Sequence, residues 1–383
     1  MRARGPGRFC AVGAGVAILL CVFSLALAQS VPAPAISAPS YVLLDFTSGH
    51  AIVADNADER REPASLTKLM TAYLVFAALR DQTITATQIV TVSTAAWRAE
   101  GSRMFIDPRK SVTVDELLRG VIVQSGNDAS IALAELVAGS ETAFADKMNA
   151  EAARLGLTNT HFANATGLSD PQHYSTAADL AQLAAALIRV FPEDYRRYSL
   201  REYRYNNITQ PNRNRLLWLD PYVDGMKTGH TDAAGWCLIG SAKRGERRLL
   251  AVVLGAGSDG ARTNDAQQLL NYGFQAFDSV QLYPPGKSIS SLRVWKGEAN
   301  DVAAGFVAAK YITLPKGKAE KLALSMTATE PLVAPVVKGQ NVGTVNVSLE
   351  GKVVAQFPLV ALAEVRAANI FGRAWDTVRL WFK

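Results

Sequence analysis

Short alternations of hydrophobic and polar residues occur at both ends of the central part of the chain. Residues 41–46 and 51–54 flank the turn-forming run Thr47-Ser48-Gly49-His50, which predicts a strand hairpin. Residues 235–242 and 247–255 flank 243–246 in the same way and predict a second hairpin. Strands therefore open and close this part of the sequence.

Between the two hairpins, apolar residues recur every three to four positions, the period of a helix. Thr113 and Glu116 have the spacing of a capping box and predict a helix start. The expected helices cover 66–79, 113–123, 128–137, 143–155 and 176–190, and a closing helix covers 262–277. The order strands, helices, strands, helix predicts one α/β domain whose sheet receives strands from both ends of the segment.

The composition changes at Tyr283-Pro284-Pro285-Gly286, where a Pro- and Gly-rich turn separates two regions. From there to residue 361 the sequence is rich in Val, Thr, Lys and Gly, with short strand-like runs. The hairpin 343–349 and 353–359 is the clearest of them. We expect a small all-β domain over 284–361.

The last segment, 364–383, predicts an amphipathic helix. Apolar side chains, four of them aromatic, recur at three- and four-residue steps, and cations fall largely between them. The segment is too short and too charged to cross a bilayer, so we expect it to lie on a membrane surface. The alternative is that this apolar face packs on the β domain. The apolar positions are Ile370, Phe371, Ala374, Trp375, Val378, Trp381 and Phe382.

Residues 1–28 have the layout of a secretory signal. Three arginines precede an apolar run from 11 to 27, and Ala26-Leu27-Ala28 supplies small residues at a cleavage site. An uncleaved membrane anchor is the alternative. The Pro- and Ala-rich stretch 29–40 reads as a linker. These features predict an exported protein on the periplasmic face of the cytoplasmic membrane, attached peripherally.

Composition excludes several other classes of function. The chain has 383 residues, of which 49% are hydrophobic, enough for a full core. Its net charge of +6 includes the three signal arginines, and no basic stripe follows, so we expect no nucleic-acid partner. Outside the signal the one cysteine is Cys237, which we expect to be a buried structural thiol. The four histidines have no metal-ligand spacing, so no metal or other cofactor is expected.

Ser65 and Lys68 form the only Ser-x-x-Lys pair in the chain, and they start a largely apolar helix. Residues three apart share a helix face, so the lysine amine can reach the serine hydroxyl. Burial or a second cation would lower the pKa of Lys68 and make it a base for a serine nucleophile. The alternative is a helix cap followed by a surface lysine.

Two further short motifs supply the other groups that acyl transfer needs. Ser125-Gly126-Asn127 lies between two apolar helices, where Ser125 can relay a proton and Asn127 can hold a substrate amide or a lysine. Lys227-Thr228-Gly229 introduces a strand, along which a substrate backbone can lie beside Gly229 while Lys227 and Thr228 bind a carboxylate. Alone, each would be explained by an ordinary helix connector or strand entry.

Together, the stretches 65–72, 125–129 and 227–235 resemble the motifs of the low-molecular-mass penicillin-binding proteins, the serine D-alanyl-D-alanine carboxypeptidases. The similarity extends through 165–169 and 173–180. It implies a serine transpeptidase/β-lactamase-like α+β fold, with an antiparallel sheet flanked by helices, over a catalytic domain at 41–279. The β domain and the tail match the longer carboxypeptidase members.

The resemblance also implies roles for individual residues. Ser65 would attack the bond between two terminal D-alanines of a peptidoglycan stem peptide, with Lys68 as general base and Ser125 as proton relay. Asn127 would position the substrate, and the backbone N–H groups of Ser65 and His230 would form the oxyanion hole. β-Lactams would acylate the same serine. The carboxylate would be bound by Lys227 and Thr228 beside Gly229, with Arg262 as a further cation.

Other activities are compatible with part of this pattern. A class A β-lactamase would need a Glu-x-x-Leu-Asn motif between Ser125 and Lys227, and none occurs. A D,D-endopeptidase of the same family ranks second, because its short members lack the β domain and anchor. A non-catalytic penicillin sensor or cell-wall binding module is more remote, because such a protein would be expected to have lost Ser65, Lys68 or Lys227.

Overall fold

The computed structural model describes residues 31–381. The expected signal segment, the first part of the linker and the final Phe382 and Lys383 lie outside this range. Within it, no helix is long and apolar enough to cross a bilayer.

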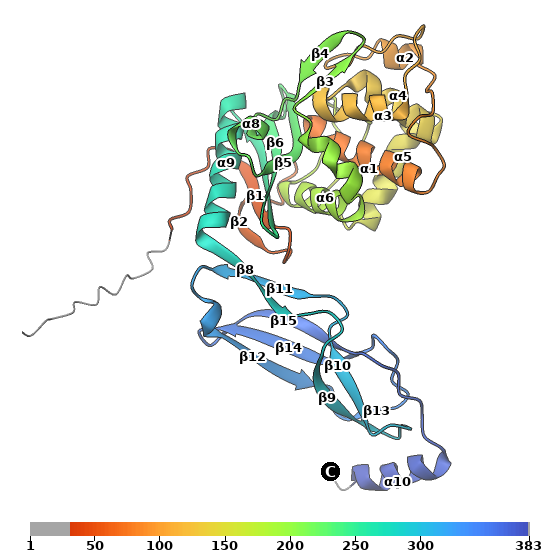
Figure 1. Cartoon of the computed structure of the whole chain (residues 1–383), viewed down its shortest axis with the longest axis vertical. Coiled ribbons are helices and arrows are strands. Elements are labelled where there is room, and N and C mark those ends of the chain that lie inside the picture. Colours follow the sequence, from red (N-terminus) through yellow and green to blue (C-terminus); the bar gives the residue numbers. More distant parts are fainter. Residues whose placement is uncertain (1–30, 382–383) are drawn as a thin grey trace, which may run out of the picture. The chain divides into compact units, whose positions relative to one another are not determined.

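A five-stranded sheet forms the centre of the first part of the chain (Figure 1), with the strand order β2-β1-β7-β6-β5. Every neighbouring pair is antiparallel. Because β1 pairs with β7, the sheet joins the two ends of the segment, as the sequence predicts. β5 is an edge strand. The strands are β1 (Ser40–Asp45), β2 (Ala51–Asp55), β5 (Val223–Thr231), β6 (Gly235–Arg244) and β7 (Arg247–Ala256).

Helices cover both faces of this sheet (Figure 1). α9 packs on β6 and β7, and α6 packs on β7 and β1. The larger apolar core lies between the sheet and a group of helices that includes α1 and α4. The helices are α1 (Lys68–Arg80), α2 (Thr94–Trp97), α3 (Val114–Arg119), α4 (Asn127–Ala138), α5 (Glu141–Arg154), α6 (Ala177–Val190), α7 (Pro192–Tyr195), α8 (Leu216–Leu219) and α9 (Asp259–Ala276).

Several helix boundaries differ from the sequence prediction, and three of the differences have a clear local reason. The first predicted helix opens with a 3-10 turn, η1 (Ala64–Thr67), before α1 begins. The capping box at Thr113 is present, but α3 passes into a π-helical turn, η2 (Gly120–Gln124), before the break. The closing helix begins three residues early because the Ser258 side chain caps α9.

One hairpin was not predicted. β3 (Glu202–Tyr205) and β4 (Ile208–Pro211) pair antiparallel, and the turn between them places Asn206 and Asn207 in the left-handed region. Asn tolerates this conformation better than most residues, so the two asparagines were the available sequence signal. A 3-10 turn, η3 (Arg196–Ser199), precedes the hairpin.

The remainder of the chain forms two further sheets and a short 3-10 turn, η4 (Ala319–Lys321). A six-stranded sheet has the order β12-β14-β15-β10-β9-β13, and β8 pairs with β11. The predicted hairpin 343–349 with 353–359 is present as β14 and β15. The strands are β8 (Phe277–Tyr283), β9 (Ser288–Trp295), β10 (Asp301–Gly305), β11 (Lys310–Pro315), β12 (Leu322–Ala328), β13 (Leu332–Val333), β14 (Asn341–Leu349) and β15 (Lys352–Ala361).

The chain ends in α10 (Ile370–Trp381), as the sequence predicts. Its apolar side chains do not pack on the β-strands before it, because Phe371 is 85% exposed, Trp375 66% and Trp381 84%. The helix is tethered by Asp376, whose carboxylate accepts a hydrogen bond from the Lys296 backbone N–H at 2.6 Å. The alternative in which the apolar face packs on the β domain is therefore wrong in this structure.

Candidate active site

Ser65 lies in η1, directly before α1, and the backbone at this turn is strained. Ala64 has a φ of 47°, a left-handed conformation that costs an alanine about 1–2 kcal/mol. β5 lies directly against this turn. A Cβ added to Gly229 would be only 3.1 Å from the Ser65 nitrogen. A larger residue at position 229 would push this turn away by a few tenths of an ångström, so glycine keeps β5 close to the nucleophile.

Lys68 is 1% exposed, and its amine contacts three oxygen atoms. Lys68 Nζ lies 2.8 Å from Ser65 Oγ, 2.7 Å from Asn127 Oδ1 and 2.5 Å from the Thr166 carbonyl oxygen. Burial, and secondly the charge of Arg213, lower the pKa of Lys68 to about 7. A large fraction of this lysine is therefore neutral at physiological pH.

The three contacts orient the neutral amine. A neutral amine has two protons and one lone pair. The Thr166 carbonyl and Asn127 Oδ1 can only accept, so they take the two protons. The lone pair then faces the Ser65 hydroxyl. This arrangement makes Lys68 able to remove the proton from Ser65.

Ser125 follows the π-helical turn and has a φ of 64°, again in the left-handed region. This conformation brings Ser125 Oγ to 2.9 Å from Lys227 Nζ, which also donates to the Thr228 carbonyl at 2.8 Å. Burial, together with the nearby charge of Lys68, lowers the pKa of Lys227 well below its ordinary value. Ser125 and Lys227 therefore form a second hydroxyl–amine pair besides Ser65 and Lys68.

The other predicted site residues lie on β5 and α9. Thr228 is 5% exposed, while the exposed His230 packs against Trp236 with ring centroids 4.0 Å apart and the ring planes tilted by 35°. Arg262 is close to the strand, but four of its N–H groups have protein acceptors. Nη1 donates to the carbonyls of Gly229 and Cys237, and Nε and Nη2 donate to Asp259. Most of the Arg262 guanidinium is therefore already paired, half of it with strand carbonyls and half with Asp259 of its own helix.

Comparison with known proteins agrees with this geometry. The family model described as D-alanyl-D-alanine carboxypeptidase matches residues 27–258, and the model described as penicillin-binding protein 5, C-terminal domain, matches 277–367. The chain belongs to the D-alanyl-D-alanine carboxypeptidase family. The family resemblance and the fold expected from the sequence are thereby confirmed.

Two relatives and two crystal structures show how far the similarity extends. D-alanyl-D-alanine carboxypeptidase DacC of Escherichia coli is 44% identical over 97% of this chain and 95% of its own, and DacF of Bacillus subtilis is 35% identical over 90% of each. Penicillin binding protein 5 from Haemophilus influenzae superposes with a TM-score of 0.85 at 42% identity, covering 88% of this chain and 99% of its own. The carboxypeptidase DacD from Francisella tularensis gives 0.74 at 32% identity, covering 88% and 95%.

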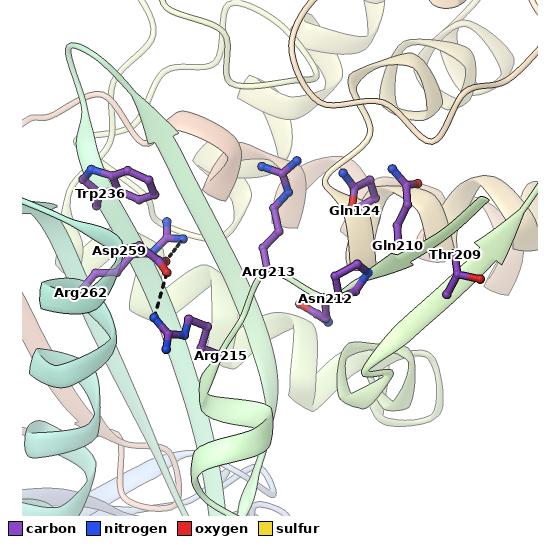
Figure 2. A pocket seen from close by; sticks show the side chains of 10 residues that line it. Gln124, Thr209, Gln210, Asn212, Arg213, Arg215, Trp236, Asp259 and Arg262 are labelled. Atoms are coloured by element: carbon purple, nitrogen blue, oxygen red, sulfur yellow. Dashed lines mark hydrogen bonds and ion pairs between the residues drawn. The ribbon is translucent and has the colours of Figure 1, made fainter.

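A cation that the sequence prediction missed projects toward the site of this carboxypeptidase family member. Figure 2 shows Arg213 extending between Trp236 on one side and Gln124 on the other, over a cavity of about 530 Å³. Among the described residues, no ion pair or hydrogen bond is found for its guanidinium. Its charge helps to lower the pKa of both Lys68 and Lys227. Arg213 is therefore better placed than Arg262 to offer several donors to an anion.

A buried carboxylate that the sequence analysis did not single out holds the loop 104–106. Asp128 is fully buried and accepts hydrogen bonds from the backbone N–H groups of Met104, Phe105 and Ile106 at 3.0, 2.8 and 3.2 Å. Its neighbour Asn127 donates from Nδ2 to the Glu100 carbonyl at 2.6 Å. This bond fixes the amide so that Oδ1 faces Lys68.

Cys237 is fully buried, as predicted, and burial raises the pKa of its thiol to about 11. The thiolate is the reactive form of cysteine, so this residue is inert at neutral pH. It lies on β6, opposite Gly229 of β5. Its place is structural.

Proposed function

We propose that this chain is a serine D-alanyl-D-alanine carboxypeptidase, which removes the terminal D-alanine from peptidoglycan stem peptides through an acyl-enzyme on Ser65. The observation that carries the proposal is the Lys68 amine, which is buried, has a pKa of about 7 and lies 2.8 Å from Ser65 Oγ. Each step of the reaction follows from a contact of this amine or of the Ser125–Lys227 pair.

In the acylation step, Ser65 Oγ attacks the carbonyl carbon of the penultimate D-alanine while its proton moves to Lys68 Nζ. The backbone N–H groups of Ser65 and His230 stabilise the developing oxyanion. As the tetrahedral intermediate collapses, the C–N bond breaks and Ser125 delivers a proton to the departing amine, while the proton held by Lys68 passes to Ser125 and leaves Lys68 neutral again. Water then attacks the ester and gives a proton to Lys68, which returns it to Ser65 Oγ as the product acid leaves.

Recognition rests on the edge of the sheet. The substrate backbone adds as a strand along β5, beside Gly229, because an edge strand has unpaired backbone groups. Lys227, Thr228 and Arg213 bind the terminal carboxylate, with a smaller contribution from Arg262. Asn127 orients Lys68 and contacts the substrate. β-Lactams acylate Ser65 because their amide stands in for the D-Ala-D-Ala bond.

We further propose that the chain is divided into a catalytic domain, expected at 41–279, a β domain at 284–361 and a tail helix at 364–383. The separate apolar cores and the limits of the two family models support the division. β8 crosses the expected limit at 279 and pairs with β11, which favours a boundary at Ala276.

The tail helix attaches the exported enzyme to the periplasmic surface of the cytoplasmic membrane. The support is its exposed apolar face, which includes Phe371, Trp375 and Trp381, next to the cations Arg373 and Arg379. Each cation near an anionic surface contributes about 1 kcal/mol. An amphipathic helix of this kind lies in the interface and does not span the bilayer.

Intact-protein mass spectrometry with and without benzylpenicillin, combined with D-alanine release from a pentapeptide, tests the function. We expect a penicilloyl adduct and release of one D-alanine per peptide. Ser65→Ala should abolish both without lowering the melting temperature, and retained activity would exclude the mechanism. Penicillin turnover without an adduct indicates a lactamase. Cleavage of cross-linked dimers but not pentapeptides indicates an endopeptidase, and an adduct without D-alanine release indicates a sensor.

A further inference from the structure

His173 lies behind the nucleophile turn and has no part in the reaction as described so far. It is 2% exposed, and its Nε2 lies 2.7 Å from Oγ1 of the fully buried Thr67. Thr67 is one of the two residues between Ser65 and Lys68. The imidazole therefore contacts the segment that carries both reacting groups.

The hydrogen bonds of the ring identify its tautomer. The Ala163 backbone N–H donates to Nδ1 at 3.2 Å, so Nδ1 is an acceptor. In a neutral imidazole the proton is then on Nε2, which donates to Thr67 Oγ1. Burial lowers the pKa of His173 to about 4. The charge of Asp170 acts in the opposite direction, and the charges of His161 and Lys68 lower the pKa further. The imidazole ring is therefore neutral at neutral pH.

This bond is one of four that join the loop 163–173 to η1 and α1, and the longest of them runs from Ser65 Oγ to the Thr166 carbonyl at 3.5 Å. The second joins the Thr166 carbonyl to Lys68 Nζ, and the third joins the Ala165 carbonyl to Thr71 Oγ1 at 2.7 Å. The loop also presses on the turn at Gly167, where a Cβ would lie 1.8 Å from the Ala64 carbonyl oxygen. Thr67 and Lys68 lie four and three residues before Thr71, about one helical turn away, so the bonds to these residues fall on the same side of the helix start.

We propose that His173 is a positioning residue for Lys68: through its bond to Thr67 it holds the loop so that the Thr166 carbonyl takes one amine proton and the lone pair faces Ser65. The inference rests on the proposed function, because it concerns the base of that reaction. Without the bond to Thr67, the loop 163–173 can move away from η1. Water can then reach the Lys68 amine, which loses its fixed orientation.

A purely structural role is the competing explanation, since the ring also packs edge-on against Phe162 at a centroid distance of 5.8 Å. His173→Phe retains an aromatic ring and loses both hydrogen bonds. His173→Gln can keep a donor toward Thr67 and an acceptor toward Ala163. His161→Phe is the matched control, because His161 belongs to the same region but is only half-buried and contacts the Gln172 carbonyl instead.

The measurement is the rate constant for acylation of the full-length enzyme by benzylpenicillin as a function of pH. We expect His173→Phe to lower it by about 10- to 100-fold, the loss typical of a displaced reacting group. The midpoint of the rise with pH should also move upward, because a wetter amine is easier to protonate. His173→Gln should restore most of the rate, and His161→Phe should behave like the parent enzyme.

Thr67→Val removes the other end of the bond and keeps the inference testable if His173→Phe does not fold. When both variants fold, the double variant should lose little more than either single variant, because they break the same bond. An unshifted pH midpoint, or a fall in melting temperature with an unchanged rate constant, would overturn the inference. D-alanine release by the parent enzyme tests the proposed function separately, since the positioning role is measured relative to parental acylation by penicillin.

Discussion

Residues 31–276 bury Lys68, Lys227 and Arg262 almost completely, whereas the sheets after Ala276 have cores of aliphatic and aromatic side chains. Among the described residues of that later part, Thr313 is the buried polar side chain. Burying a charged group costs free energy unless it is paired or changes its protonation state. Burial of the amines therefore lowers the free energy of unfolding of residues 31–276 while keeping those amines reactive. The sheets after Ala276 bury no such groups among the described residues.

Replacing the buried base should give the largest effect. Lys68→Met retains the volume of the side chain and removes the amine, so we expect acylation by penicillin to fall by about 10³-fold or more. In the parent enzyme the rate should rise with pH through about 7, the pKa of Lys68, because the neutral amine is the base. The check is the pH profile of acylation, and a flat profile in the parent would exclude Lys68 as the base.

The same substitution tests the cost in stability. In the unfolded chain the pKa of Lys68 returns to ~10.4. Between pH 7 and that value the unfolded state therefore binds one more proton at Lys68 than the folded state does. The free energy of unfolding should therefore rise with pH through this window in the parent, and less steeply in Lys68→Met. Denaturant unfolding at several pH values measures the difference.

A cavity in the later part should separate folding from catalysis. Leu359 is fully buried in the core of the six-stranded sheet, and Leu359→Ala should cost about 2–5 kcal/mol of its stability. Penicillin acylation at 25 °C should not change. Leu250→Ala, an equally buried position on β7, is the matched control and should lower both quantities. Calorimetry with a parallel acylation assay checks the pair, and a loss of activity in Leu359→Ala would contradict the separation.

Removing the tail should have the smallest effect on chemistry. Deletion of 364–383 should leave D-alanine release unchanged and move the protein from the membrane to the soluble fraction. Phe371→Ala combined with Trp375→Ala should do the same with all cations retained, since the apolar face supplies most of the attachment. Continued sedimentation with membranes would show that attachment lies elsewhere.

The sequence was informative where a chemical group must be a particular side chain. Ser65, Lys68, Ser125 and Lys227 were predicted because nucleophile, base and relay have few alternatives and stand in recognisable motifs. The Thr166 contact escaped prediction because a backbone carbonyl has no residue signature. Arg213 was not predicted as a site residue because its position depends on the β3–β4 hairpin directly before it, which was not predicted either. The commitment of Arg262 to strand carbonyls depends on tertiary contacts that no spacing reveals.

The position of β5 at the edge of its sheet has a consequence for how the protein loses activity on heating. An unpaired strand edge is a template for aggregation unless neighbouring elements restrict access to it. Here η1 and η3 pack on β5 and most of its residues are buried, so another protein's sheet has no access to this edge. Heat or denaturant that loosens the packing of η1 and η3 would disturb the site residues and expose the edge together. Loss of activity and irreversible aggregation should then begin at the same temperature. A bound β-lactam should raise that temperature, because it binds the folded state beside β5.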